Sequence, residues 1–501
     1  MKTNFTPIIV GVAQYTQSKE TSSPLDPIGL MGVACEQAIK DTGNEKIRER
    51  IDTLRVVNIF CHSYEDAPGA LAQHIRIDPN NSYYSAIGGN TPQLYVNKAA
   101  MDIAAGRSQV TLISGAEAFY AVRRGKKGDV SLNWPPFCSP KSLDGETKSG
   151  VSDTELRYDM LAPVYAYALI ENRLRHVAGR SIETHRKMMG RTLERIAERA
   201  SKNPYSWSKE ALKADEITLP SPSNRMAGFP YTVRMSANLN VDQSAAIILT
   251  SEETALELGI PRDKWIYPMG GATFHNVWNI ATRPDLHTSP ALRHAGEKAL
   301  EQAGLSISEI DAFDFYNCFS CAVELARNEL GVSAEDQRPI TLTGGLAYFG
   351  GPGNNYSLHA IANAVQYLRT SDKKSALVTA LGWLNTKWSA GVYGKGPGKT
   401  PWFERDDSAI QERINSAAFP EPIVEADGVL TIESYTVVHG KDGEPHHATI
   451  LGNLENGRRA FAFMFEPKEA LARIETESPI GKKGKVAYQK EFGFNTITLE
   501  A

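Results

Sequence analysis

Two stretches far apart in the chain decide the fold: GGNTPQLYVNKAAMDIA at residues 88–104 and GGPGNNYSLHAIANAV at residues 350–365. Each begins with a pair of glycines and continues as a helix with apolar residues three to four positions apart. The predicted elements around them follow the same order in both halves of the chain. A repeated order indicates an internal duplication of one α/β unit, in which helices cover a mixed sheet. We therefore predict an α/β fold made of two similar halves.

Short apolar runs on either side of these stretches supply the strands of both halves. In each half a first strand is followed by a helix that ends at a glycine, Gly43 or Gly304. The predicted strands are PIIVGVAQY (7–15), IDTLRVVNIF (51–60) and SQVTLISGAEA (108–118) in the first half, and DKWIYPMGGATF (263–274), IDAFDFYN (310–317) and SALVTALGW (375–383) in the second.

Two further segments do not belong to the repeat. Residues of about 117–225 form a helical, aromatic insertion, and a long segment between two strands often covers a site. We expect it to contribute to ligand binding and to a lid. After a Gly/Pro-rich linker, alternating strands with turns at GKDGE and LENGR predict a small β domain, a barrel of the OB type. The predicted domains are 1–257, 258–398 and 405–501.

Composition excludes several classes of function. The chain has 501 residues, 42% of them apolar, and a net charge of −4. No apolar run approaches the roughly 20 residues of a membrane span, and no basic face suggests nucleic-acid binding. The N-terminus lacks a signal-type apolar core, and five cysteines favour a reducing compartment over a disulfide framework. We expect a cytoplasmic protein without membrane or nucleic-acid partners.

The stretch FDFYNCFSCAVELARNELG, residues 313–331, carries two cysteines at a predicted strand-to-helix junction. Cys318 and Cys321 stand three residues apart, where the positive end of a helix favours a thiolate. The spacing fits a thioredoxin-like redox pair, or half of a zinc site that would need a second pair of ligands. It also fits one catalytic cysteine with a packing neighbour, or two buried core cysteines. The spacing alone does not choose among these four.

The duplicated core, the insertion and the glycine turns together resemble the thiolase superfamily over about residues 5–395. The segments that carry the resemblance are GGPGNN, NRMAGFPYTVRMSANLNVDQSAA and SQVTLISGAEA. Within it the chain is most similar to the sterol-carrier-protein-type thiolases, and its C-terminal β domain resembles that of the thiolase-like proteins type 1. The resemblance implies a duplicated five-layer αβαβα fold with a helical insertion, plus a C-terminal OB-like β domain.

The resemblance also implies four motifs around one pocket, and three of them have lost their catalytic residues here. The position of the nucleophilic cysteine falls on Gly89. The G-H-P motif is Gly350-Gly351-Pro352, and the C-x-G motif is Ala380-Leu381-Gly382. Loss of a covalent nucleophile can cost on the order of 10⁶ in rate, so conventional thiolase chemistry is not expected.

The fourth motif, H-D-C-F in the sterol-carrier branch, is Tyr316-Asn317-Cys318-Phe319 here. The resemblance places Cys318 in the pocket and leaves Cys321 as packing, which favours neither a redox pair nor zinc. We therefore predict Tyr316, Asn317, Cys318 and His359 as catalytic candidates and no metal site. The glycine turns present backbone N–H groups that can hold a thioester oxygen or an enolate. The predicted oxyanion and substrate-binding residues are Gly89, Asn90, Gly350, Gly351 and Gly382.

Carbon–carbon cleavage or formation beside a CoA thioester, of the retro-aldol kind, requires no covalent nucleophile. We predict this reaction, in lipid metabolism, with the CoA thioester as substrate or ligand and no tightly bound cofactor. The alternatives are a non-catalytic protein that binds CoA esters and an acyltransferase that uses Cys318. Thiolases usually dimerise through edge strands of the core. Since the added β domain could cover that surface, we expect a monomer or a homodimer.

Overall fold

The first half of the chain folds into a five-stranded mixed sheet. The computed structural model describes residues 5–499. The strand order is β1–β7–β4–β2–β3, in which β7 is antiparallel to both of its neighbours and β2 is parallel to both of its own. Strands β2, β4 and β7 are buried along their whole length, as expected for strands with helices on both faces. The strands are β1 Pro7–Thr16, β2 Thr53–Val56, β3 Asn81–Tyr84, β4 Val110–Ala118 and β7 Asp242–Ser251.

The second half repeats this pattern in a four-stranded sheet of order β8–β11–β10–β9. Strand β11 is antiparallel to both neighbours and β10 is parallel to β9, as in the series β1–β7–β4–β2. The predicted internal duplication is therefore confirmed by strand order and direction. The strands are β8 Tyr267–His275, β9 Ala312–Asp314, β10 Ser375–Gly382 and β11 Lys387–Gly394.

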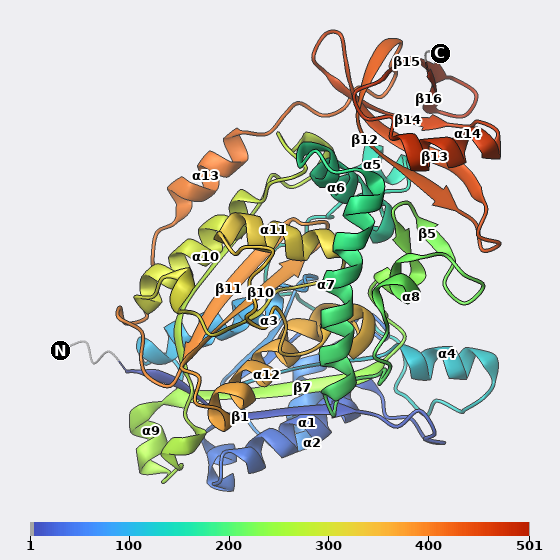
Figure 1. Cartoon of the computed structure of the whole chain (residues 1–501). Coiled ribbons are helices and arrows are strands. Elements are labelled where there is room, and N and C mark those ends of the chain that lie inside the picture. The colour runs from blue at the N-terminus through green and yellow to red at the C-terminus, as the bar shows by residue number, and fades with distance from the viewer. Residues whose placement is uncertain (1–4, 500–501) are drawn as a thin grey trace.

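Helices complete five layers around the two sheets (Figure 1). Helices α3 (Thr91–Ala104) and α12 (Tyr356–Thr370) begin at the two glycine turns and contact strands of both sheets, so they form the central layer. The outer face of the first sheet is covered by α1 (Pro27–Asp41) and α2 (Ala67–Ile75), and that of the second by α10 (Pro290–Ala303) with α11 (Ser320–Leu330) packed beside it. The five-layer αβαβα fold is confirmed.

The insertion runs between β4 and β7 and consists mainly of helices. Its longest helix, α7, extends along the second half of the chain and contacts α11 (Figure 1). No helix within residues 5–499 is both long and apolar enough to cross a membrane. The elements of the insertion are α4 Phe119–Lys127, α5 Asp153–Arg157, α6 Pro163–Val177, α7 Ile182–Lys202, α8 Ala214–Thr218, β5 Met226–Gly228 and β6 Tyr231–Thr232; α9 Glu252–Glu257 follows β7.

The C-terminal region is a closed five-stranded barrel, seen in red in Figure 1. Its order is β12–β13–β14–β16–β15, and β15 pairs again with β12 to close it. Strand β5 of the insertion also pairs with β12, so the barrel and the insertion share one sheet. The predicted β barrel is confirmed; its OB type stays a prediction. The elements are α13 Ser408–Ser416, β12 Gly428–His439, β13 Pro445–Leu454, β14 Arg459–Met464, α14 Lys468–Glu477, β15 Lys483–Gln489 and β16 Phe494–Leu499.

A buried arginine fastens the barrel to the core. Arg459 donates from Nε and Nη2 to both carboxylate oxygens of Glu433, at 2.8 and 2.6 Å. The same guanidinium donates to the carbonyls of Ala281, Arg283 and Pro284 in the second half of the core. Because a buried guanidinium is costly unless its N–H groups are paired, this contact fixes the position of the barrel.

The outer edge of the first sheet is paired by the insertion. The backbone N–H of Asp144 donates to the carbonyl of Tyr84 at 2.7 Å, and the N–H of Ala86 donates to the carbonyl of Asp144 at 2.8 Å. The barrel instead packs on α6 and on the loop that Arg459 contacts. At this end of β3 the edge of the core is therefore covered by the insertion and not by the C-terminal barrel.

Candidate active site

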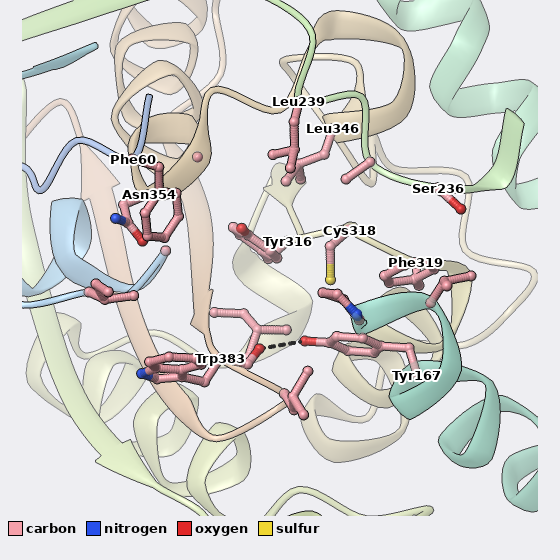
Figure 2. Close-up of a pocket in the computed structure, with 18 of the residues that line it drawn as sticks. Phe60, Tyr167, Ser236, Leu239, Tyr316, Cys318, Phe319, Leu346, Asn354 and Trp383 are labelled. Carbon is pink, nitrogen blue, oxygen red and sulfur yellow. Dashed lines mark hydrogen bonds between the residues drawn. The ribbon is translucent and has the colours of Figure 1, made fainter. Parts of the chain in front are cut away.

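A cavity of about 410 Å³ opens between the two halves and the insertion. Most of its lining is aliphatic or aromatic, and none of the lining residues carries a charged side chain. The side chains in the lining that carry a polar atom are Tyr167, Ser236, Tyr316, Cys318, Asn354 and, through its indole N–H, Trp383. Figure 2 shows Tyr316 and Cys318 near the centre of this group, with the sulfur of Cys318 pointing into the cavity. Such a site suits an uncharged hydrocarbon group attached to a polar reacting centre.

Cys318 lies in the cavity as predicted, but it is not poised as a thiolate. Helix α11 begins two residues later, at Ser320, so the sulfur does not sit on the first turn. Burial raises the pKa of Cys318 to about 12. The Tyr167 hydroxyl and the Phe319 N–H lower this pKa, but their effect is smaller than that of burial. The expectation that the helix end favours a thiolate is therefore wrong. Cys321 is buried outside the cavity lining, where its sulfur lies 3.3 Å from the Tyr231 hydroxyl oxygen.

The hydroxyl of Tyr316 lies beside Gly89, at the turn that opens helix α3. A Cβ added to Gly89 would come within 2.7 Å of Tyr316 Oη and would also meet the carbonyl oxygen of Leu381. Burial, and secondarily the neighbouring Cys318, raises the pKa of Tyr316 well above its usual range, so the phenol is neutral. Within residues 5–499 its hydroxyl has no hydrogen-bond partner, which leaves it available to a ligand.

The other two predicted catalytic side chains lie outside the cavity lining. Asn317 donates to the carbonyl of Phe315 at 2.8 Å and accepts from the N–H of Leu346 at 3.0 Å, so it holds backbone. His359 is fully buried, with Nδ1 at 3.0 Å from Gln14 Oε1, and burial lowers its pKa to about 3. The expectation that His359 reaches the pocket is wrong, because its position in α12 directs the ring between the layers.

The predicted oxyanion residues reach the cavity only in part. Gly89 lines it, whereas Asn90, Gly350, Gly351 and Gly382 do not. Asn90 donates to Ser389 Oγ at 3.3 Å, and the place of a Cβ on Gly350 is filled by Gln243 Oε1. The second glycine turn and the C-x-G position contribute neighbouring residues instead. These are Gly353, Asn354 and Leu381.

Two important groups near the cavity were not predicted from the sequence. Tyr167 on α6 donates its hydroxyl hydrogen to the carbonyl of Trp383 at 2.9 Å, a bond drawn in Figure 2, and accepts from the N–H of Asn385 at 3.0 Å. The length and aromatic content of the insertion indicated that it covers the site. Helical spacing alone does not show whether Tyr167 or Tyr165 faces the cavity. Glu117 at the end of β4 is the second group.

Glu117 lies directly behind the cavity wall. Its carboxylate accepts the backbone N–H groups of Phe60 and Cys61 at 2.8 and 2.9 Å. It also fills the space that a Cβ on Gly353 would need, and both Phe60 and Gly353 line the cavity. Burial raises the pKa of Glu117 to about 7, against the effect of the two backbone donors.

A cluster of side chains of the kinds that bind metal ions lies outside the cavity lining. Ligand atoms of Glu171, His185 and Glu324 lie within 4.8 Å of one another. Glu171 accepts from Tyr231 and Ser320, at 2.8 and 2.5 Å, and lies 2.7 Å from His185 Nε2. Arg180 is 2.6 Å from Glu324, so a guanidinium already supplies positive charge. The cluster joins α6, α7 and α11.

The whole chain superposes on the crystal structure of a monomeric SCP2-thiolase-like protein type 1 from Mycobacterium smegmatis. The two share 30% sequence identity and a TM-score of 0.85, with 100% of each chain covered. The chain belongs to the SCP2-thiolase-like proteins of type 1. Two family profiles agree: the thiolase-like protein type 1 additional C-terminal domain over residues 409–491, and the thiolase C-terminal domain-like family over residues 272–351.

More distant relatives match only part of the sequence of this SCP2-thiolase-like protein. It is 23% identical over 291 residues to an acetyl-CoA acetyltransferase of Methanocaldococcus jannaschii, and 27% identical over 153 residues to one of Syntrophomonas wolfei. These matches span 56% and 30% of the chain, and 65% and 36% of the relatives, which is less than two thirds of either relative. The structure titled Ltp2-ChsH2(DUF35) aldolase matches with 20% identity, a TM-score of 0.60, and coverage of 79% of this chain and 99% of that one. That likeness shows the fold alone.

Proposed function

We propose that this protein acts on an acyl-CoA thioester and breaks or forms a carbon–carbon bond beside the thioester, without a covalent acyl-enzyme. One observation carries the proposal: the hydroxyl of Tyr316 occupies the place where a side chain at position 89 would project. An acid–base group therefore replaces a nucleophile at the centre of a cavity without charged residues. The retro-aldol reaction needs proton transfer and enolate stabilisation, but no nucleophile.

The protonation states of two lining residues support a reaction that depends on proton transfer. Tyr316 and Cys318 both have raised pKa values, so both are proton donors at neutral pH. In bond formation, Tyr316 gives its proton to the alkoxide that develops on the acceptor carbonyl and becomes a phenolate. Cleavage is the reverse step, in which that phenolate takes the proton of the 3-hydroxyl group and becomes the neutral phenol again. The thiol of Cys318 and the backbone at Gly89 and Gly353 face the cavity and are available to the enolate. Each such donor can contribute roughly 3 kcal/mol to a transition state.

The barrel supports the proposal through its position. Helix α6 lines the cavity with Tyr167, while Leu169 and Asn172 on the same helix bond to the barrel at Ser434 and Tyr435. The aldolase of similar fold is titled as a complex with a DUF35 protein. We propose that the fused barrel replaces such a partner by holding α6 in place, and that the protein works as a monomer.

A second candidate is binding of CoA esters without catalysis. It is favoured by the lining, which offers no carboxylate, imidazole or amine as a strong base within the described residues. The acyltransferase alternative is weaker, because a thiol with a pKa of about 12 is rarely a thiolate at neutral pH. Acetyl-CoA acetyltransferase activity is named for the distant relatives and is not carried to this chain.

The test is a panel of acyl-CoA and 3-hydroxyacyl-CoA esters, incubated with the protein and analysed by mass spectrometry, with binding measured by calorimetry. We expect a shortened acyl-CoA from at least one 3-hydroxyacyl-CoA. Tyr316→Phe should lower turnover by 10² or more while binding persists. Tyr488→Phe, in the barrel, is the matched control and should keep full activity. Tight binding without any product would favour the second candidate instead.

A further inference from the structure

Exposure distinguishes the mouth of the cavity from its closed end. Among the lining residues, Phe60, Leu161 and Leu239 are 44%, 59% and 49% exposed. Leu381 and Leu384 are only 2% and 4% exposed, so they belong to the closed end, together with Phe319 and Leu346. CoA is large and anionic, and the lining offers it no charged partner. It therefore stays at the mouth, and the acyl group extends toward the turn that carries Leu381 and Leu384.

This turn, which joins β10 to β11, has an unusual backbone. Trp383 and Asn385 both have a φ of 57°, in the left-handed region that residues other than glycine rarely adopt. Such conformations persist only where surrounding contacts impose them, and they gather at functional sites. Here both residues are fastened to the same atom: the Tyr167 hydroxyl donates to the carbonyl of Trp383 and accepts from the N–H of Asn385.

The insertion holds the indole of Trp383 from a second side. A Cβ on Gly150 would collide with the ring atoms of Trp383, so the ring packs directly on the backbone of Gly150. The indole then forms part of the cavity lining, as Figure 2 shows. Tyr167 itself is held in place by stacking on Phe319, with ring centroids 4.8 Å apart.

We propose that Trp383 is the specificity-determining residue for the size of the acyl group, and that Tyr167 is the positioning residue that fixes its turn. The proposal rests on the proposed function, since it takes a CoA thioester as the ligand. A fixed turn gives the closed end a defined shape, against which an uncharged acyl chain of several carbons packs. An acetyl group makes little apolar contact with this wall, whereas a longer acyl chain packs along it.

The experiment is calorimetric titration of acetyl-CoA and octanoyl-CoA into the full-length protein. Tyr167→Phe keeps the ring and its stacking but removes both hydrogen bonds to the turn. We expect its Kd for octanoyl-CoA to rise at least tenfold and its Kd for acetyl-CoA to change less than threefold. Tyr165→Phe is the matched control, because this tyrosine is two residues away on α6 and packs on Gly228 instead. It should bind both esters like the wild type.

Gly150→Ala gives an independent test, because the added methyl forces the indole to move while Tyr167 stays intact. It should also change the ratio of the two Kd values at least threefold. If circular dichroism shows that Tyr167→Phe is unfolded, Gly150→Ala alone provides the test. With a substrate that is turned over, the effect should appear in KM and not in kcat. An equal loss for both esters, or no loss in either variant, overturns the specificity role but leaves the proposed function standing. A wild-type protein that binds neither ester overturns the proposed function, and this inference with it.

Discussion

Tyr316 Oη lies 2.7 Å from the point where Gly89 would carry a Cβ. The two positions therefore exclude each other: a side chain at 89 and a phenol at 316 do not fit together. A chain with a tyrosine at 316 therefore has no room for a nucleophilic side chain at position 89. Introducing such a side chain would require the ring of Tyr316 to move or to be replaced by a smaller side chain.

Gly89→Ala should therefore abolish any reaction that depends on Tyr316. The methyl meets the phenol oxygen and also the backbone oxygen of Leu381, which does not move freely, so overpacking should cost about 1–3 kcal/mol of the free energy of unfolding. Urea denaturation and turnover measure the two effects. Gly396→Ala is the control, since a Cβ there meets nothing within 4 Å. An active and fully stable Gly89→Ala protein would contradict the exclusion.

Cys318 should resist alkylation at neutral pH, although the cavity is open to small molecules. With a pKa of about 12, its thiolate fraction and its labelling rate should rise about tenfold for each pH unit through the alkaline range. Peptide mass spectrometry after iodoacetamide treatment between pH 7 and 9.5 measures this. Cys138, which is exposed, serves as the internal reference. If Cys318 is labelled as fast as Cys138 at pH 7, the acyltransferase alternative regains its basis.

Glu117 should make the protein less stable as the pH rises. Its pKa is about 7 when folded and near 4.5 when unfolded, so between these values the folded state binds more protons. Stability from this group is complete below pH 4.5, and about 3 kcal/mol is lost by pH 7.5. The difference in unfolding free energy between the wild type and Glu117→Gln should change by this amount between pH 4.5 and 7.5. A difference that is independent of pH would show that the carboxyl titrates normally.

Arg459→Ala should loosen the barrel from the core. The substitution leaves Glu433 buried without its partner and the carbonyls of Ala281 and Pro284 without their donor, at a cost of about 3–5 kcal/mol. We expect earlier proteolysis in the linker of residues 395–407 and a lower Tm. Arg458→Ala is the neighbouring control, because Arg458 is exposed and should leave both measurements unchanged. Equal behaviour of the two variants would argue against the role of Arg459.

The repeated glycine-to-helix stretches were enough to predict the duplicated core, because each half needs the same apolar spacing to cover its own sheet. The site was less predictable. The motif around Cys318 placed the thiol in the cavity, but its raised pKa comes from burial, which outweighs the opposing effect of the distant Tyr167 hydroxyl, and no local pattern reports either effect. His359 and Asn317 were misplaced for a similar reason. A side chain on a correctly predicted helix or turn can face the layer behind the cavity, and spacing does not tell the two directions apart.

The pairing of β5 with β12 affects the order in which the parts of the chain can fold during synthesis. Val438 pairs with Gly228, and the N–H of Asn495 donates to the hydroxyl of Tyr158, a partner 337 positions earlier. Contacts of such separation form late, since they close very long loops. On a ribosome, the insertion must wait for the last strands to emerge before α6 gains its outer neighbour. A chain released before residue 428 would carry both halves of the core but leave the wall of its cavity without support.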